Sequence, residues 1–207
     1  MKLQIAFDMT DLEKALTVAR QVEQYADIFE VGSLLVYKYG QEAVKQFKEQ
    51  FPQRTILVDA KISDRSREAI TLFAQAGADW ITVMAGAGRA VVHTACTAAH
   101  ELNKKVMLDL LDASSPGQSA LEAKSLGADA LLFHKPADDD EHMVFSERWD
   151  MVKGNTTLPV FVSTTLSRQN VAEVLSSNPS GIVVGRAITH AEDPAQEAAY
   201  FASILSS

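Results

Sequence analysis

The sequence predicts an α/β fold in which residues 1–207 form one (β/α)8 TIM barrel. Eight short apolar runs, rich in β-branched residues, alternate with longer segments of helical period, which is typical of βαβ units around a parallel sheet. A short motif also recurs where a helix ends and the next strand begins. Eight even units, with no domain-sized segment left over, favour a closed barrel over an open doubly wound sheet.

Each apolar run has the length of a buried strand, and the segments between the runs predict crossover helices. After the first run, Leu12, Leu16 and Val22 follow the helical period, and Val171 and Val174 follow it before the last run. The predicted strands lie at residues 3–7, 28–31, 56–58, 80–84, 106–110, 130–133, 160–162 and 182–184.

The recurring motif reads AGADW at 76–80 and LGADA at 126–130, and YADI at 25–28 is a version without glycine. Glycine at this place suits the left-handed end of a helix, where a Cβ would be strained. The segment 86–89, GAGR, is a glycine pair in a loop rather than a G-x-G-x-x-G fingerprint, and we expect backbone freedom there with at most a minor binding role.

The composition limits the classes of function. The net charge of −8 argues against nucleic acid or an anionic membrane as a partner. No apolar run is long enough for a membrane span, and no signal-peptide pattern follows Met1, so we expect a cytoplasmic location. Cys96 is the only cysteine, which rules out an internal disulfide, and its neighbours predict a packed helix position.

Polar residues follow almost every predicted strand. In a barrel these strand ends form one face, where catalytic and binding residues gather. Single residues have structural alternatives: Asp8 could cap the next helix, and Arg186 could form a surface ion pair. Their convergence favours a functional site. The residues, in strand order, are Asp8, Glu30, Asp59 with Lys61, Asp109, His134, Ser163 with Thr164 and Thr165, and Gly185 with Arg186.

The sharpest local signal is DAKISD at residues 59–64. Strand alternation places Asp59 and Lys61 on the same side, pointing into the mouth of the barrel, with Asp64 near the start of the next helix. A lysine between carboxylates stays protonated, so it can serve as a fixed cation or as a proton donor. The structural alternative is an ion pair at the strand end, with Asp64 as a helix cap.

Two carboxylates at neighbouring strand ends, Glu30 and Asp59, would suit Mg²⁺. Such an ion could hold two adjacent oxygens of a sugar and stabilise an enediolate. A phosphorylated substrate would need a local cation on this acidic chain. Arg186, after Gly185 at the last strand, stands where barrels often bind phosphate.

Five segments spread over nearly the whole chain carry a family resemblance. They read KLQIAFD at 2–8, FEVG at 29–32, DAKISD at 59–64, AGADWITV at 76–83 and VGRAIT at 184–189. With them the chain resembles the orotidine 5′-phosphate decarboxylase suprafamily, and within it the branch of 3-hexulose-6-phosphate synthase and 3-keto-L-gulonate-6-phosphate decarboxylase. The D-x-K-x-x-D motif alone would indicate only the suprafamily.

The resemblance implies a Mg²⁺-dependent lyase that acts on a sugar phosphate. Glu30 and Asp59 would bind Mg²⁺, and Lys61 would face the enediolate. Asp64 would reach the active site of a neighbouring subunit, which implies a homodimer with shared sites. The other implied residues are Asp8, Asp109 and His134 in the active site, and Gly185 with Arg186 at the phosphate.

Three positions bear on the reaction that the resemblance implies. Orotidylate decarboxylases carry lysine where Glu30 stands, and gulonate-phosphate decarboxylases tend to have glutamate at 109 and arginine at 137. This chain has Asp109, as the hexulose-phosphate synthases do, which favours an aldol reaction: ribulose 5-phosphate is deprotonated to an enediolate that attacks formaldehyde. The alternatives are decarboxylation of a 3-keto sugar-acid phosphate, and a diverged barrel that only binds a sugar phosphate.

Three segments depart from the family pattern. Thr164-Thr165 replaces two glycines, and threonine does not readily adopt positive φ, although its hydroxyl can donate a hydrogen bond to phosphate. Arg65-Ser66 replaces small residues after Asp64. The segment after His134 differs from both branches, and its acidic run at 138–140 predicts a solvated loop.

Overall fold

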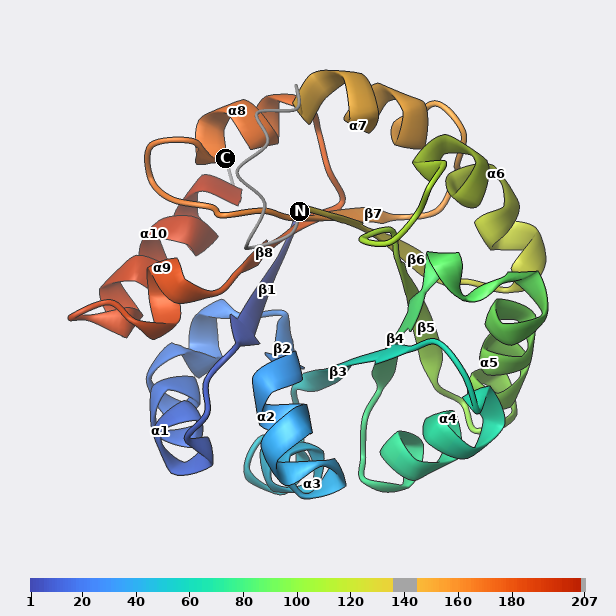
Figure 1. The fold of residues 1–207 in the computed structure, drawn as a ribbon. Coiled ribbons are helices and arrows are strands. Elements are labelled where there is room, and N and C mark those ends of the chain that lie inside the picture. Colours follow the sequence, from blue (N-terminus) through green and yellow to red (C-terminus); the bar gives the residue numbers. More distant parts are fainter. Residues whose placement is uncertain (136–144, 206–207) are drawn as a thin grey trace.

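Eight parallel strands close on one another in chain order in the computed structural model of the protein, which describes residues 1–135 and 145–205. Figure 1 shows the helices as an outer ring around these strands. The predicted (β/α)8 barrel is therefore confirmed. The strands are β1 Lys2–Phe7, β2 Ile28–Val31, β3 Thr55–Ile62, β4 Trp80–Met84, β5 Lys105–Asp109, β6 Ala130–His134, β7 Val160–Ser163 and β8 Gly181–Val184.

The helices follow the predicted pattern of one or two after each strand. The apolar residues of period 3.6 turn inward: Leu12, Leu16 and Val22 on α1 are buried, as are Val171 and Val174 on α8. None of the described helices has the length and apolar character needed to cross a bilayer. The α-helices are α1 Leu12–Val22, α2 Ser33–Tyr39, α3 Gln41–Gln50, α4 Ser66–Gln75, α5 Arg89–Glu101, α6 Pro116–Leu126, α7 Phe145–Lys153, α8 Val171–Ser176, α9 Arg186–Thr189 and α10 Pro194–Leu205.

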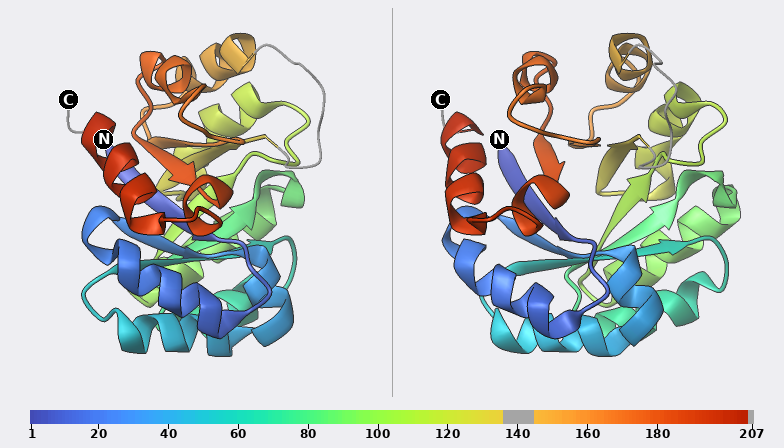
Figure 2. Two further views of the ribbon diagram at one scale, coloured as in Figure 1. Left: turned by 90° about the vertical axis from the view of Figure 1, so that its left-hand side faces the viewer. Right: turned by 60° about the vertical axis from the view of Figure 1, so that its left-hand side comes forward.

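The barrel has two apolar layers. A large cluster lies between the strands and the helices, and a smaller one consists of strand residues alone and fills the barrel interior. The last helix completes the outer ring beside the first strand: the views in Figure 2 agree that α10 lies next to β1 and α1. The interior cluster comprises Ala6, Ile28, Leu57, Met107, Ala130, Leu132, Phe161 and Val183, with Trp80 packed against it.

The same pair of hydrogen bonds recurs at the base of the barrel within the described residues. The residue just before each even-numbered strand donates its main-chain N–H to a carbonyl of the preceding odd-numbered strand. Its side chain accepts the N–H of that same partner residue. The pairs are Asp27 with Leu3, Asp79 with Ile56, Asp129 with Val106, and Ser180 with Val160.

This arrangement explains the motif that recurs in the sequence. The aspartates of the AGAD and LGAD copies are Asp79 and Asp129, which pin β3 and β5. The glycines before them, Gly77 and Gly127, have φ of 101° and 98°, as predicted for left-handed helix ends. The motif therefore serves the stability of the barrel base and stands apart from the polar strand ends.

Asp79 offers a test of this role. Burial alone would raise its pKa, but the N–H of Ile56 and the ammonium of Lys48, 2.8 Å away, outweigh burial, so the pKa of Asp79 lies below its ordinary value. Its contribution to stability is thus present above the unfolded pKa of about 3.9 and is lost as the pH falls through the lower folded pKa.

We expect Asp79→Ala to lower the free energy of unfolding by about 1.5–3 kcal/mol at neutral pH, because a charge-assisted bond to the main chain is lost. Ser180→Ala, which removes the neutral version of the same bond, should lower it by about 0.5–1.5 kcal/mol. Urea unfolding at pH 7 and pH 3 measures both. A loss for Asp79→Ala that stayed unchanged between the two pH values would contradict the assignment.

Candidate active site

The polar residues at the strand ends lie on the inward-facing positions of the strands. Leu57 belongs to the interior cluster, and Asp59, two residues later, continues the same face toward the mouth, where the side chain of Lys61 meets it. On β5, Met107 is followed in the same way by Asp109. The interior is therefore apolar in its lower part and charged where the strands end.

Lys61 is the centre of this charged region. Its Nζ lies 3.1 Å from Asp59 Oδ2 and 3.2 Å from Asp109 Oδ2, and both carboxylates are buried. Burial alone would lower the pKa of Lys61, but the two carboxylates outweigh it and raise that pKa. The predicted protonated lysine is thus held as a fixed ammonium between two strands.

His134 and Asp109 form a second contact at the mouth. The Nδ1 atom of His134 lies 3.0 Å from Asp109 Oδ2, and the main-chain N–H of Leu111 donates to Asp109 Oδ1 at 2.9 Å. Burial alone would raise the pKa of Asp109, but His134 and Lys61 lower it further than burial raises it. Asp109 is therefore an ionised carboxylate that orients the imidazole and leaves Nε2 facing away from this bond.

Asp8 and Glu30 lie close enough to Asp59 to interact with its charge. Burial raises the pKa of Glu30 well above its ordinary value, and the negative charges of Asp59 and Asp8 raise it further. Burial and the charge of Asp59 also raise the pKa of Asp8. Because Asp11 caps α1, Asp8 does not have that role; its carboxylate instead lies against Gly32, where a Cβ would overlap it.

One predicted detail of β3 is wrong. A regular alternating strand was expected through Lys61, but the register with β4 shifts between Val58 and Ile62, and Lys61 has a left-handed φ of 47°. The side chains of Asp59 and Lys61 still meet on one face. The cause is a bulge in the strand, which short-range periodicity does not reveal.

Asp64 lies beyond the strand and is exposed. The alternative that it caps the next helix does not hold, because the cap position of α4 belongs to Arg65, which has a left-handed φ of 51° and makes no capping bond with its side chain. Arg65, which replaces a small residue of the family pattern, therefore occupies a backbone conformation that favours a small residue.

The predicted phosphate residues end the neighbouring strands β7 and β8. Ser163 closes β7, with Thr164 half-buried and Thr165 exposed after it, while Gly185 and Arg186 follow β8. The positive-φ residues other than glycine in the described chain are Lys61, Arg65, Asn103 and Asn178, so the threonine pair adopts its loop without such strain. Arg186 is exposed and makes no ion pair with a described residue.

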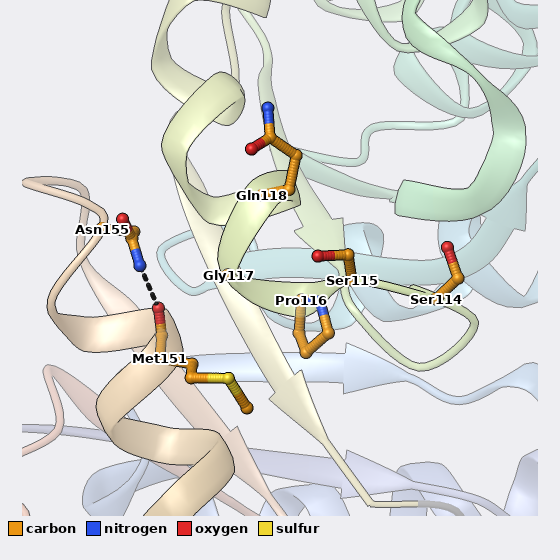
Figure 3. A pocket seen from close by; sticks show the side chains of 7 residues that line it. All are labelled: Ser114, Ser115, Pro116, Gly117, Gln118, Met151 and Asn155. Atoms are coloured by element: carbon orange, nitrogen blue, oxygen red, sulfur yellow. Dashed lines mark hydrogen bonds between the residues drawn. The ribbon is translucent and has the colours of Figure 1, made fainter.

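Two other features lie outside this site. Cys96 is buried on α5, and burial raises its pKa to about 12, in keeping with the predicted packed helix position. A pocket of about 320 Å³ lies in the outer ring between α6 and α7 (Figure 3), and its lining holds no ionisable side chain. Its residues are Ser114, Ser115, Pro116, Gly117, Gln118, Met151 and Asn155. The ionisable side chains that could carry chemistry lie instead at the charged mouth.

Sequence reasoning missed two buried polar residues that support the site. Gln4 Nε2 donates to Glu30 Oε2 at 2.6 Å, and Thr82 Oγ1 donates to Asp59 Oδ1 at 3.0 Å. Both are polar residues within otherwise apolar strands, at inward-facing positions: Gln4 lies four residues before Asp8 on the same face. This alternation along the strand was the signal available in the sequence. Ala137 and the acidic run at 138–140 lie outside the described residues.

Known proteins resemble this chain over its full length. The 3-hexulose-6-phosphate synthase of Bacillus subtilis (strain 168) is 30% identical over 207 residues, which cover 99% of each chain. The structure of 3-hexulose-6-phosphate synthase from Salmonella typhimurium has a TM-score of 0.94 and 31% identity, and the match covers 100% of this chain and 99% of that one.

A decarboxylase has a similar structure. The 3-keto-L-gulonate-6-phosphate decarboxylase of Vibrio cholerae has a TM-score of 0.84 and 25% identity, and the match covers 99% of this chain and 97% of that one. The family model described as orotidine 5′-phosphate decarboxylase / HUMPS matches residues 1–201. These matches agree with the resemblance seen in the sequence motifs, and the chain belongs to the orotidine 5′-phosphate decarboxylase / HUMPS family.

Proposed function

We propose that this protein is a carbon–carbon lyase with the activity of a 3-hexulose-6-phosphate synthase, joining ribulose 5-phosphate to formaldehyde through an enediolate. The observation that carries the proposal is the ammonium of Lys61 between two carboxylates, with His134 bonded to one of them. A fixed cation beside an oriented imidazole is what proton removal next to a carbonyl requires. The full-length similarity to named synthases supports the same reaction.

Mg²⁺ fits the acidic part of the site. Glu30 and Asp59 would hold the ion, because carboxylate oxygens are the ligands it prefers and its charge would offset both burial and the repulsion from Asp59, which raise the pKa of Glu30. Among the described residues no group of three or more His, Cys, Asp or Glu side chains is arranged to hold a metal alone, so water and substrate would complete its shell. The ion would supply positive charge to the oxygens of the enediolate.

The chain's own residues would move the protons. His134, oriented by Asp109, takes the proton from C1 of ribulose 5-phosphate, and the electron pair of that bond forms the C1–C2 double bond of the enediolate. Lys61 donates a hydrogen bond to the developing oxyanion. The C2 carbonyl then re-forms as the electron pair of the C1–C2 double bond attacks the carbon of formaldehyde, whose oxygen becomes an alkoxide and takes the proton held by His134.

The phosphate would be bound by Ser163, Thr164, Thr165, Gly185 and Arg186. They end two neighbouring strands on the face where barrels commonly bind this group, and Arg186 is free of ion pairs with described residues. Hydroxyls of the threonines would replace the close backbone approach that glycines allow. The phosphate would then lie on the same face of the barrel as the reacting carbons.

A decarboxylase remains the alternative reaction, because loss of CO2 from a 3-keto sugar-acid phosphate leads to the same kind of enediolate. The similarity to the Vibrio cholerae decarboxylase supports this alternative reaction. Asp109, rather than glutamate, favours the synthase. The third possibility is a barrel that binds a sugar phosphate without turning it over.

The first test is NMR of the protein with Mg²⁺ and ribulose 5-phosphate in D2O, with and without formaldehyde. We expect exchange of the C1 proton and, with formaldehyde, a hexulose phosphate. Exchange without product would contradict the synthase and direct the search to another electrophile or to the keto acid. Absence of both would overturn the lyase proposal.

Two substitutions test the assigned roles in that assay. His134→Asn keeps a donor for Asp109 but has no base, so exchange should slow by about 10²–10⁴-fold. Lys61→Ala removes the cation and should slow it by about 10²–10³-fold. His93→Asn changes an exposed histidine on α5 and serves as the matched control. Exchange at the wild-type rate in His134→Asn would assign the base elsewhere.

In the Glu30→Gln variant, thermal stability at pH 8 and exchange activity should change in opposite directions. Because the pKa of Glu30 is raised in the folded state, the carboxyl stabilises the fold most below its unfolded pKa of about 4.3, and this contribution is lost as the pH rises through the folded pKa. Without Mg²⁺ at pH 8, the glutamine variant should therefore have a higher Tm than the wild type, and the difference should disappear near pH 4.

The same thermal scans test the metal. Mg²⁺ should raise the Tm of the wild type at pH 8 and leave Glu30→Gln unchanged, while the variant loses the exchange activity. Glu49→Gln, at an exposed position on α3, is the control. A Mg²⁺-dependent rise in Tm that persisted in Glu30→Gln would remove this residue from the metal site.

We also propose a cytoplasmic homodimer in which Asp64 completes the site of the partner subunit. The exposed position of Asp64, without a capping role, supports this reading, as do the exposed apolar side chains Leu34, Tyr37 and Leu72. Each site would then combine Lys61 of one subunit with Asp64 of the other.

Mixed dimers test this arrangement. Equal amounts of inactive Asp64→Asn and Lys61→Ala chains, unfolded and refolded together, should recover about a quarter of the wild-type activity, because half of the dimers contain one intact site. Each variant refolded alone is the control. No recovery in verified mixed dimers would contradict a site shared between subunits.

A further inference from the structure

Thr82 lies in the middle of β4, fully buried, opposite the irregular part of β3. The regular register between the two strands stops after Val58 and resumes at Ile62. Over this stretch three residues of β3 lie opposite one residue of β4. Thr82 is therefore the β4 residue that faces the bulge carrying both Asp59 and Lys61.

The hydroxyl of Thr82 bonds to both of these residues. Its Oγ1 accepts the main-chain N–H of Lys61 at 2.9 Å and lies 3.0 Å from Asp59 Oδ1. The N–H can only donate, and a hydroxyl has a single hydrogen, so that hydrogen is directed to Asp59. Both bonds are thus defined in direction as well as in distance.

The bond to Lys61 replaces a bond of the strand ladder. Lys61 has a φ of 47°, a conformation that an L-residue adopts only where its surroundings enforce it. At the bulge its N–H finds the side chain of Thr82 as its acceptor. Without the hydroxyl, the N–H would lack this acceptor and the backbone that aims the lysine would lose its anchor.

The bond to Asp59 fixes the other half of the ion pair. Asp59 Oδ1 receives the hydroxyl of Thr82, while Oδ2 lies 3.1 Å from Lys61 Nζ. One side chain thus holds the backbone of the lysine and the carboxylate that the same lysine contacts. The three groups form a closed loop of interactions between two neighbouring strands.

We propose that Thr82 is a positioning residue whose hydroxyl sets the direction of the Lys61 ammonium and the orientation of the Asp59 carboxylate. The inference rests on the proposed function for what Lys61 and Asp59 act upon. The positioning itself rests on the two hydrogen bonds and on the bulge.

Kinetics of two variants test the proposal. Thr82→Val keeps the shape of the side chain without the hydroxyl; we expect kcat to fall roughly 10- to 100-fold while KM stays within about threefold, because the phosphate contacts lie on other strands. Thr82→Ser restores the hydroxyl and should recover most of kcat. Thr71→Val, at a half-buried threonine of α4 whose hydroxyl donates to the carbonyl of Arg67, is the control. A wild-type kcat in folded Thr82→Val would overturn the proposal.

Hydrogen exchange of the Lys61 amide gives a readout that does not depend on activity. The amide should exchange slowly in the wild type and in Thr82→Ser, and much faster in folded Thr82→Val. An amide that exchanges in the wild type as fast as an unbonded surface amide would overturn the proposal even if Thr82→Val failed to fold. A wild type without turnover would contradict the proposed function, while this measurement would still decide the role of Thr82.

Discussion

The ion pairs of Lys61 are the interaction on which the charged mouth of the barrel depends. Two buried carboxylates from different strands converge on one ammonium, and taking these groups out of water is unfavourable unless each is paired. Asp8 and Glu30 bring two further carboxyls close to Asp59, and burial together with the charge of Asp59 raises the pKa of both. A fold selected for stability alone would not gather these charges, and their cluster supports the proposal of a site that binds a cation and an anionic substrate.

At the base of the barrel, charged side chains stabilise the fold. There, aspartates such as Asp79 and Asp129 bond to the main chain of the neighbouring strand, and lysines lie beside Asp79 where water still reaches them. These bonds fix the strand register below the apolar interior. Among the described residues, the left-handed ones other than glycine and asparagine are Lys61 and Arg65, and both lie at the mouth. The barrel thus has its stabilising hydrogen bonds at one end and its candidate active site at the other.

The sequence predicts the fold well because the short apolar runs of the strands and the helical period between them are both clear. Strand starts and ends agree to within one residue for most strands, and the polar strand ends converge as expected from parallel topology. The bulge at Lys61 was not predictable, because it results from pairing with β4 and leaves no local signature. The sequence does not single out Gln4 and Thr82, because a lone polar residue within an apolar run is also compatible with an ordinary strand position. Their inward parity was visible, but only the neighbouring strand shows which group each one holds.

Asp109, which favours the synthase over the decarboxylase, is also closely constrained by its neighbours. Asp109 is fully buried, and it contacts Lys61 and His134 while accepting the N–H of Leu111. A glutamate there would carry its carboxylate one bond further from the strand, so it could not keep all of these contacts without moving the lysine or the imidazole. Residue 109 therefore does more than add a charge: its length sets where the cation and the base stand relative to each other. A change of reaction within this barrel would then require coordinated changes around Asp109, because a single longer side chain would disturb both partners at once.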